Sequence, residues 1–445
     1  MTRTTSAVEL NRAALLDRFQ RIRARTRALF DLLDDDAYYE RPIALRNPIV
    51  FYEGHLPAFA VNTLIKRGLG EPGVDEQLET IFARGIDPAT EAAAVARGNP
   101  AWPTRQVVRD YAAAADRLLA DVLAHADLVR EDRPLLRRAQ AAWAILEHEE
   151  MHQETLAYMW HQLPYGLKRA PAGYRTETET TSTPMPHRVQ IPAGDVTLGT
   201  SLADEPFAWD NELPPHVVPV ERFAIDAFNV TNAQFLEFVD VGGYRDPRWW
   251  RPQDWACLQE ASMTHPPFWE HHEGTWHWRG QFERVPLPAS WPVYVTWAEA
   301  NAYARWAGGR LPTEPEFHRA AFGTPEGDER SYPWGEAPPS NLHGNFDFSR
   351  WDPVAVGSLP AGVSAFGVHD LVGNGWEWTA TVFDGFAGFT PLPSYPEYSA
   401  DFFDREHFVM KGASPVTARE LVRRGFRNWF RPNYPYVYAT FRCVR

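Results

Sequence analysis

The sequence predicts a protein of two domains, an N-terminal bundle of four helices followed by an α+β domain. The chain has 445 residues, which is more than one ordinary hydrophobic core accommodates. Up to about residue 163 the apolar residues recur every three or four positions, a spacing typical of amphipathic helices. From about residue 188 short apolar segments alternate with Gly and Pro, which indicates strands and long loops.

We expect the helical domain to span 1–163 and to contain helices near 7–34, 50–67, 104–125 and 132–162. Polar connections between them favour an up-and-down bundle, and the less regular segment 69–103 is predicted to be mostly loop. Residues 164–187 lose the periodicity and become rich in Pro, Thr and Glu, so we expect a linker there.

The α+β domain is expected to span 188–445. Two of its segments, 232–240 and 297–308, have a helical pattern, and Thr231 and Thr296 stand where N-caps are needed. The remaining segments, such as "HRVQIPAGDVTLGT" and "LVGNGWEWTATVF", are typical of short strands with long connections.

Composition and charge exclude several classes of function. A net charge of -14 argues against nucleic acid as the main partner, and no apolar run approaches the roughly 18 uncharged residues of a membrane span. The N-terminus has no signal-peptide pattern, and Cys257 and Cys443 are the two cysteines, far apart, which favours a reducing compartment. We expect a cytoplasmic monomer or homodimer that acts on small molecules.

A candidate metal site is visible in "ILEHEEMHQETLAYMW", residues 145–160. His148 and His152 are four positions apart and therefore project from one face of a helix. His55, in the apolar segment "NPIVFYEGHLPAFAVNTL", is the candidate third ligand, because a lone polar group there would need a partner. Three imidazoles suit zinc and ferrous iron equally, and the spacing does not choose between them.

The acids around these histidines allow other interpretations. His148, Glu149 and His152 spell H-E-x-x-H, which would make the chain a zinc hydrolase with Glu149 as the base, although the usual downstream third ligand is missing. Glu149 and Glu150 point off the histidine face, so a solvated helix face is expected for them. Glu150 or Glu154 could instead accept the N–H of a ligating imidazole.

Several motifs carry a resemblance to a known family. The first domain, with its H-x-x-x-H-x-E motif, resembles the DinB-like four-helix domain. The segments "RLPTEPEF", "YPWG", "GNGWEWT", "KGAS" and "FRC" resemble the formylglycine-generating-enzyme (sulfatase-modifying-factor) domain, which has a C-type-lectin-like α+β fold. The pairing is similar to the family of ergothioneine-pathway sulfoxide synthases and selenoneine synthases.

This resemblance implies a mononuclear non-haem iron(II) enzyme that uses dioxygen to join sulfur or selenium to the imidazole of hercynine. It implies that His55, His148 and His152 bind Fe(2+), and that Asn428 and Trp429 contact hercynine.

The resemblance also implies roles for residues at which the chain follows or departs from the family pattern. Tyr395 and Tyr398 are the candidate proton donors, and Met151 stands where many relatives have Gln. Phe430 stands where members that use γ-glutamylcysteine have Asp, and "FARGID", which includes Arg84, replaces their tyrosine-bearing loop.

Loss of that acid predicts a changed chalcogen donor. A neutral donor rich in hydroxyl groups, such as a selenosugar, would suit the polar and aromatic side chains of Arg431 and Tyr434, and we therefore expect selenoneine synthesis. The alternative is a sulfoxide synthase that uses cysteine or γ-glutamylcysteine. A formylglycine-generating oxidase would need a cysteine pair that Cys257 and Cys443 do not supply, and a lectin-like binding module would leave the three histidines unexplained.

Overall fold

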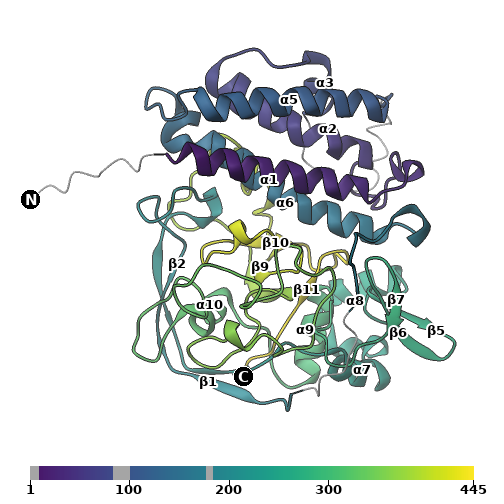
Figure 1. Cartoon of the computed structure of the whole chain (residues 1–445). Coiled ribbons are helices and arrows are strands. Elements are labelled where there is room, and N and C mark those ends of the chain that lie inside the picture. The colour runs from purple at the N-terminus through teal and green to yellow at the C-terminus, as the bar shows by residue number, and fades with distance from the viewer. Residues whose placement is uncertain (1–9, 84–100, 177–183) are drawn as a thin grey trace, which may run out of the picture. The chain divides into compact units, whose positions relative to one another are not determined.

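The computed structural model describes residues 10–83, 101–176 and 184–445 (Figure 1). The chain forms two compact units, Met1–Arg169 and Ala170–Arg445. Within the described residues, no helix is both long enough and apolar enough to cross a membrane. Cys257 is exposed, Cys443 is buried, and both are free thiols.

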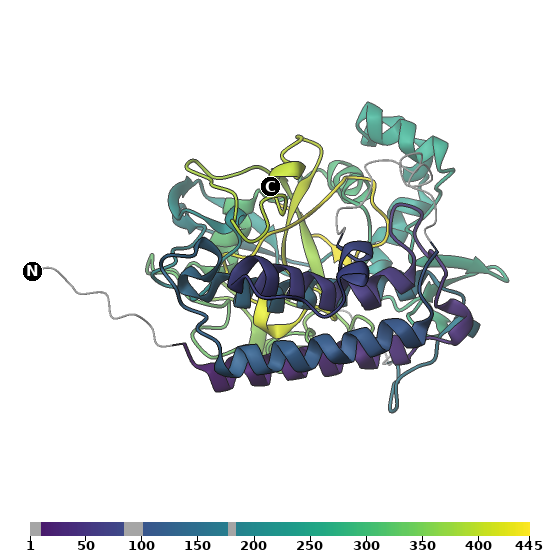
Figure 2. The same ribbon diagram turned by 90° about the horizontal axis from the view of Figure 1, so that it is seen from above.

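The first unit is helical, as predicted. Its helices are α1 (Arg12–Asp31), α2 (Ile49–Ala60), α3 (Glu76–Ile81), α5 (Arg105–His125) and α6 (Gln140–Gln162), and α2 continues as a π-helix over Val61–Leu69. Four of them confirm the predicted helices, with ends shifted by at most eight residues; the largest shift is at the start of α6, because Pro134–Ala139 forms a separate 3₁₀ helix, and α3 was not predicted. Helix α1 packs against α5 and α6, and α2 packs against α5, so that the purple α1 and the blue α5 lie side by side in Figure 2.

Local sequence explains where α1 and α5 begin. The Asn11 side chain accepts a hydrogen bond from the amide of Ala14, and Thr104 accepts one from the amide of Val107, which satisfies otherwise unpaired N–H groups. The apolar stripes of both helices then turn inward, and the buried side chains include Leu15, Phe19, Ile22, Val108, Leu119 and Leu123.

The second unit is α+β, also as predicted. Its helices are α7 (Asn232–Asp240), α8 (Pro252–Glu260), α9 (Trp297–Trp306) and α10 (Glu314–Phe322). Thr231 and Thr296 cap α7 and α9 in capping boxes, which confirms the predicted starts of those helices. Helices α8 and α10 were not predicted, although Thr313 caps α10 in the same manner.

Within the described residues of this unit, the strands form four small sheets. The central one has the order β10 (Asn428–Phe430), β9 (Phe408–Ala413), β8 (Gly375–Val382), β11 (Ala439–Thr440), in which only the β11–β8 pair is parallel. The other sheets are antiparallel and pair β1 (Arg188–Ile191) with β4 (Phe223–Asp226), β2 (Gly194–Leu198) with β3 (His216–Val220), and β5 (Trp269–His272) with β6 (Thr275–Arg279) and β7 (Arg284–Pro286).

The motifs that carry the family resemblance build the interior of this unit. "GNGWEWT" and "KGAS" supply β8 and β9, the two central strands. Arg442 of "FRC" is fully buried and donates from Nε and Nη2 to the two carboxylate oxygens of Glu377, at 2.7 and 2.6 Å. In "RLPTEPEF", Arg310 pairs with Glu316 of α10 at 2.6 Å. The hydrogen bonds and the ion pair of these residues therefore stabilise the fold of the unit.

Candidate metal centre

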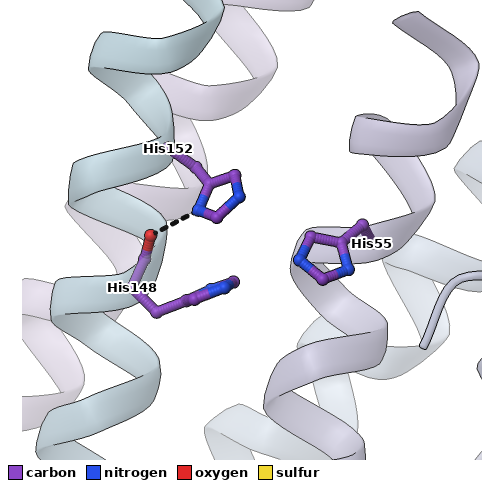
Figure 3. Close-up of side chains that lie close together, drawn as sticks. All are labelled: His55, His148 and His152. Carbon is purple, nitrogen blue, oxygen red and sulfur yellow. Dashed lines mark hydrogen bonds between the residues drawn. The ribbon is translucent and has the colours of Figure 1, made fainter. Parts of the chain in front are cut away.

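Three histidines converge from two helices of the first unit. His55 lies on α2, and His148 and His152 lie one turn apart on α6; Figure 3 shows their imidazoles pointing toward one another. One nitrogen from each ring falls in a cluster whose members lie within 4.8 Å of one another. Such a cluster could hold a metal ion with three nitrogen ligands.

Backbone carbonyls fix the tautomers of two of these rings. Nδ1 of His55 lies 2.8 Å from the carbonyl oxygen of Phe82, and Nδ1 of His152 lies 3.0 Å from that of His148, the bond dashed in Figure 3. A carbonyl oxygen cannot donate, so both Nδ1 atoms carry the proton and each Nε2 keeps its lone pair. Nε2 of His55 is buried and makes no hydrogen bond within the described parts of the chain. A metal ion would be the partner that this nitrogen otherwise lacks.

Burial keeps the imidazoles neutral. Desolvation lowers the pKa of His55 to about 4 and that of His148 well below its usual range. Desolvation, followed by the charge of His55, lowers the pKa of His152 to about 3. All three rings are therefore unprotonated at neutral pH, which is the state that a metal ion requires.

Aromatic rings cover two of the imidazoles. Phe59 stacks on His148 with ring centroids 3.5 Å apart, and Phe51 stacks on His55 at 4.9 Å. These rings remove water from one face of each histidine and restrict its rotation. No feature of the sequence marked Phe59 or the carbonyl of Phe82 as neighbours of the site.

The acids of α6 have a different role from the one expected. Glu149 is buried and accepts hydrogen bonds from Arg23 at 2.7 Å and from Thr26 at 2.5 Å, both on α1. Glu150 is buried and receives Arg18 of α1 in two hydrogen bonds, at 3.0 and 2.5 Å.

The expectation of a solvated face for Glu149 and Glu150 is therefore wrong, because α1 covers that face. The expectation that Glu150 accepts an imidazole N–H is also wrong, since its carboxylate binds Arg18 and the observed acceptors are backbone carbonyls. Glu149 is held by α1, whereas the histidines face α2, so its position argues against the role of base in a zinc hydrolase.

The remaining predicted site residue of this unit that the structure describes is Met151. It precedes His152 on α6 and is partly exposed. Arg84 lies outside the described residues.

In the second unit, three predicted residues belong to one aromatic cluster. Trp429 of β10 stacks on Phe383 with ring centroids 4.1 Å apart, and Tyr398 meets it edge-on at 5.3 Å. Tyr398 is buried and stacks on Trp209 at 4.0 Å, and Tyr395 lies 5.7 Å from Tyr398.

The other predicted residues of β10 and the loop that follows it form a second group. Phe430 stacks on Tyr434 with ring centroids 4.9 Å apart. Arg431 forms ion pairs with Glu406 at 2.9 Å and with Asp404 at 3.5 Å. Asn428 points its Oδ1 at the amide of the next residue, at 2.9 Å.

Each of the two units matches a known protein family. Residues 18–156 match the DinB superfamily, and residues 174–445 match the sulfatase-modifying factor enzyme 1-like domain. The hercynine oxygenase of Mycolicibacterium smegmatis is 35% identical over 445 residues, which cover 97% of this chain and 99% of that protein. The hercynine oxygenase of Mycolicibacterium thermoresistibile is 35% identical over 446 residues, which cover 96% of this chain and 93% of that protein.

A fungal relative extends this similarity. Ergothioneine biosynthesis protein 1 of Neurospora crassa is 27% identical over 502 residues, covering 93% of this chain and 55% of that protein. Both bacterial relatives are matched over almost their whole length, and both domains expected from the sequence motifs are confirmed. The chain is therefore an enzyme of the family that contains the hercynine oxygenases.

Proposed function

We propose that the chain uses iron(II) and dioxygen to join a chalcogen atom to the imidazole ring of hercynine, with a selenosugar as the donor. The observation that carries the proposal is the cluster of three neutral histidines in a chain similar to hercynine oxygenases over nearly its whole length. A sulfoxide synthase that uses cysteine or γ-glutamylcysteine is the second candidate.

The residues of the first unit fit the proposed metal. His55, His148 and His152 would hold iron(II) through three nitrogens, and the buried Nε2 of His55 would gain its missing partner. Three protein ligands leave further positions for substrates, and iron(II) supplies the electron-transfer chemistry with dioxygen that zinc lacks. The protein's part is to keep the rings neutral, oriented and shielded by Phe51 and Phe59.

The residues proposed to bind hercynine suit its chemistry. Hercynine carries a quaternary ammonium group, and a cation over an aromatic face gains about 0.5–2 kcal/mol depending on desolvation. We assign this contact to Trp429, hydrogen bonding to Asn428, and apolar contact to Met151. Tyr395 and Tyr398 are the proposed proton donors; the packing of Tyr398 between Trp209 and Trp429 would hold its hydroxyl in a fixed direction.

The choice of donor rests on Phe430. The stack of Phe430 on Tyr434 gives an apolar and aromatic surface where an acid would be needed to pair with the amino group of γ-glutamylcysteine. An uncharged sugar can pack on such rings and hydrogen-bond to Arg431 and Tyr434. Arg84 is a further proposed donor contact.

Turnover after anaerobic loading with iron(II) tests the proposal. Oxygen uptake and product mass are measured with hercynine alone and with hercynine plus one of three donors, a selenosugar, cysteine or γ-glutamylcysteine. We expect turnover with the selenosugar to exceed that with either thiol. Preference for a thiol would instead establish the second candidate. If none of the substrate pairs causes oxygen uptake, both candidates are refuted.

Two variants make the metal assignment testable. His148→Ala is expected to abolish iron binding and turnover together. His125→Ala, which changes an exposed histidine of α5, is the matched control and is expected to leave both unchanged. Full activity of the His148 variant would refute the assignment.

A further inference from the structure

Gly54, the residue before His55, occupies a place in α2 where a larger residue does not fit. Gly inside a helix costs about 1 kcal/mol relative to Ala, so its presence in a buried helix needs a reason. A Cβ atom at Gly54 would lie 2.4 Å from Cε2 of Phe82 and 2.5 Å from Cδ2 and Cζ of the same ring. These separations are far shorter than any van der Waals contact. The ring of Phe82 therefore fills the space that a side chain at position 54 would take.

The ring of Phe82 has little room to move away. It is fully buried, lies nearly parallel to Trp102 with centroids 6.1 Å apart, and lies 6.3 Å from Phe51. Phe51 in turn stacks on His55. In a packed interior of this kind, a shift of one ring displaces its neighbours and its own backbone.

The backbone of Phe82 holds His55. Phe82 is the C-cap of α3, and its carbonyl oxygen accepts the Nδ1–H of His55 at 2.8 Å. The side chain of Asn62 also ties α3 to the helix that continues from α2, by donating to the carbonyl of Glu79 at 3.2 Å. One residue, Phe82, thus contacts two consecutive residues of α2, with its ring against Gly54 and its carbonyl on His55.

This dependence distinguishes His55 from His152. His152 donates its Nδ1–H to His148, one turn back on the same helix, so its orientation is set within α6. His55 donates to a different segment of the chain, 27 residues away, and its orientation depends on how closely α3 approaches α2. Gly54 is the residue that permits this approach.

We propose that Gly54 and Phe82 are positioning residues for the metal ligand His55. Gly54 admits the Phe82 ring against α2, and this contact places the carbonyl that fixes the direction and the tautomer of the imidazole. The inference rests on the proposed function only in treating His55 as a metal ligand. Loss of an outer partner of a metal-bound histidine typically lowers metal affinity by about 10–100-fold.

A double-mutant cycle on the full chain tests this proposal with cobalt(II) as the probe. Cobalt(II) is titrated anaerobically into the wild type, Gly54→Ala, Phe82→Ala and the double variant, and binding is followed by visible absorption. We expect Gly54→Ala to weaken binding by about 10–100-fold when the ring is present. We expect it to have no further effect in the Phe82→Ala background, because the clash is gone.

Two further measurements separate positioning from general destabilisation. Leu119→Ala, which opens a cavity at a buried position of α5, a helix that carries none of the three histidines, is expected to bind cobalt(II) as the wild type does. Long-range ¹H–¹⁵N spectra of the metal-free protein are expected to show the Nδ1–H tautomer of His55 in the wild type and a changed signal in Gly54→Ala.

The outcomes distinguish this inference from the proposed function. The inference would be overturned if Gly54→Ala bound cobalt(II) with wild-type affinity. It would also be overturned if Gly54→Ala lowered the affinity equally in the wild-type and the Phe82→Ala backgrounds. If Gly54→Ala does not fold, the comparison of Phe82→Ala with the double variant carries the test, since these two must bind equally. If the wild type binds no cobalt(II), the metal centre itself is refuted.

Discussion

Replacing Glu149 by Gln asks whether this acid of α6 stabilises the bundle or acts as a base. Oε1 of Glu149 accepts hydrogen bonds from Arg23 and Thr26, and all three side chains are buried. Gln keeps the size of the side chain and one acceptor oxygen, but it removes the negative charge beside Arg23. The guanidinium is then left with less compensation in a place that water does not reach.

The expected loss of stability follows from the partners that remain. Breaking a buried ion pair by removing one partner costs about 3–5 kcal/mol. Arg23 keeps a second acid, Asp116, at 2.7 Å. We therefore expect the lower end of that range, about 3 kcal/mol, and no loss of metal affinity, because Glu149 faces α1 and the histidines face α2.

Urea unfolding, followed by circular dichroism at 222 nm, measures this loss because the affected unit is helical. The matched control is Glu76→Gln, which breaks a pair with Lys66 at 2.8 Å in which the acid is largely exposed, and which is expected to cost less than about 1 kcal/mol. Cobalt(II) affinity and oxygen uptake are measured on both variants below their unfolding midpoints. Unchanged stability together with lost turnover would refute the reasoning and restore Glu149 as a base.

Three further predictions concern the second unit. Burial raises the pKa of Glu299, which accepts a hydrogen bond from Tyr244, from 4.5 to about 7. Between pH 4.5 and 7 the folded state therefore holds a proton that the unfolded state has lost. As the pH rises through this range, the free energy of unfolding should fall by up to about 1.4 kcal/mol per pH unit. In urea titrations at several pH values, Glu299→Gln should remove this slope. Arg442→Lys cannot reproduce both hydrogen bonds to Glu377, and thermal unfolding should show a loss of about 3 kcal/mol or more; an unchanged midpoint would contradict this. Thr313→Ala removes the cap of α10 and should cost about 1 kcal/mol by urea unfolding, whereas a cost near zero would mean that the cap is dispensable.

Length made three helices of the first unit easy to predict, whereas α7, with nine residues, was predicted from its apolar pattern together with its cap Thr231. Helices α1, α5 and α6 each run for 20 residues or more, so their apolar stripes repeat over several turns. Helices α8 and α10 have nine residues each, about two and a half turns, and α3 has six. A stripe of two or three apolar residues cannot be told from a loop unless a cap accompanies it, as Thr231 does for α7; α10 carries the same signal, Thr313 with Glu316 three residues later.

The metal cluster was predictable in part because two of its members share one helix. The spacing of His148 and His152 places them on one face without any knowledge of the fold, and His55 stands out as a polar residue in an apolar segment. Their hydrogen-bond acceptors were not predictable. Every residue has a carbonyl, so the sequence does not distinguish the one at Phe82 from any other.

The acids of α6 were misread for a reason that lies in the helix itself. A helix buried on all sides is usually apolar all round, so a polar face suggests solvent. Helix α6 is buried with charges on the face toward α1, and Arg18 and Arg23 of that helix neutralise Glu150 and Glu149. Because these pairs join specific positions of the two helices, a rotation of α6 about its axis would break them. The pairs therefore stabilise the contact between α6 and α1, and a helix face that would be solvated on its own is buried because α1 supplies the opposite charges.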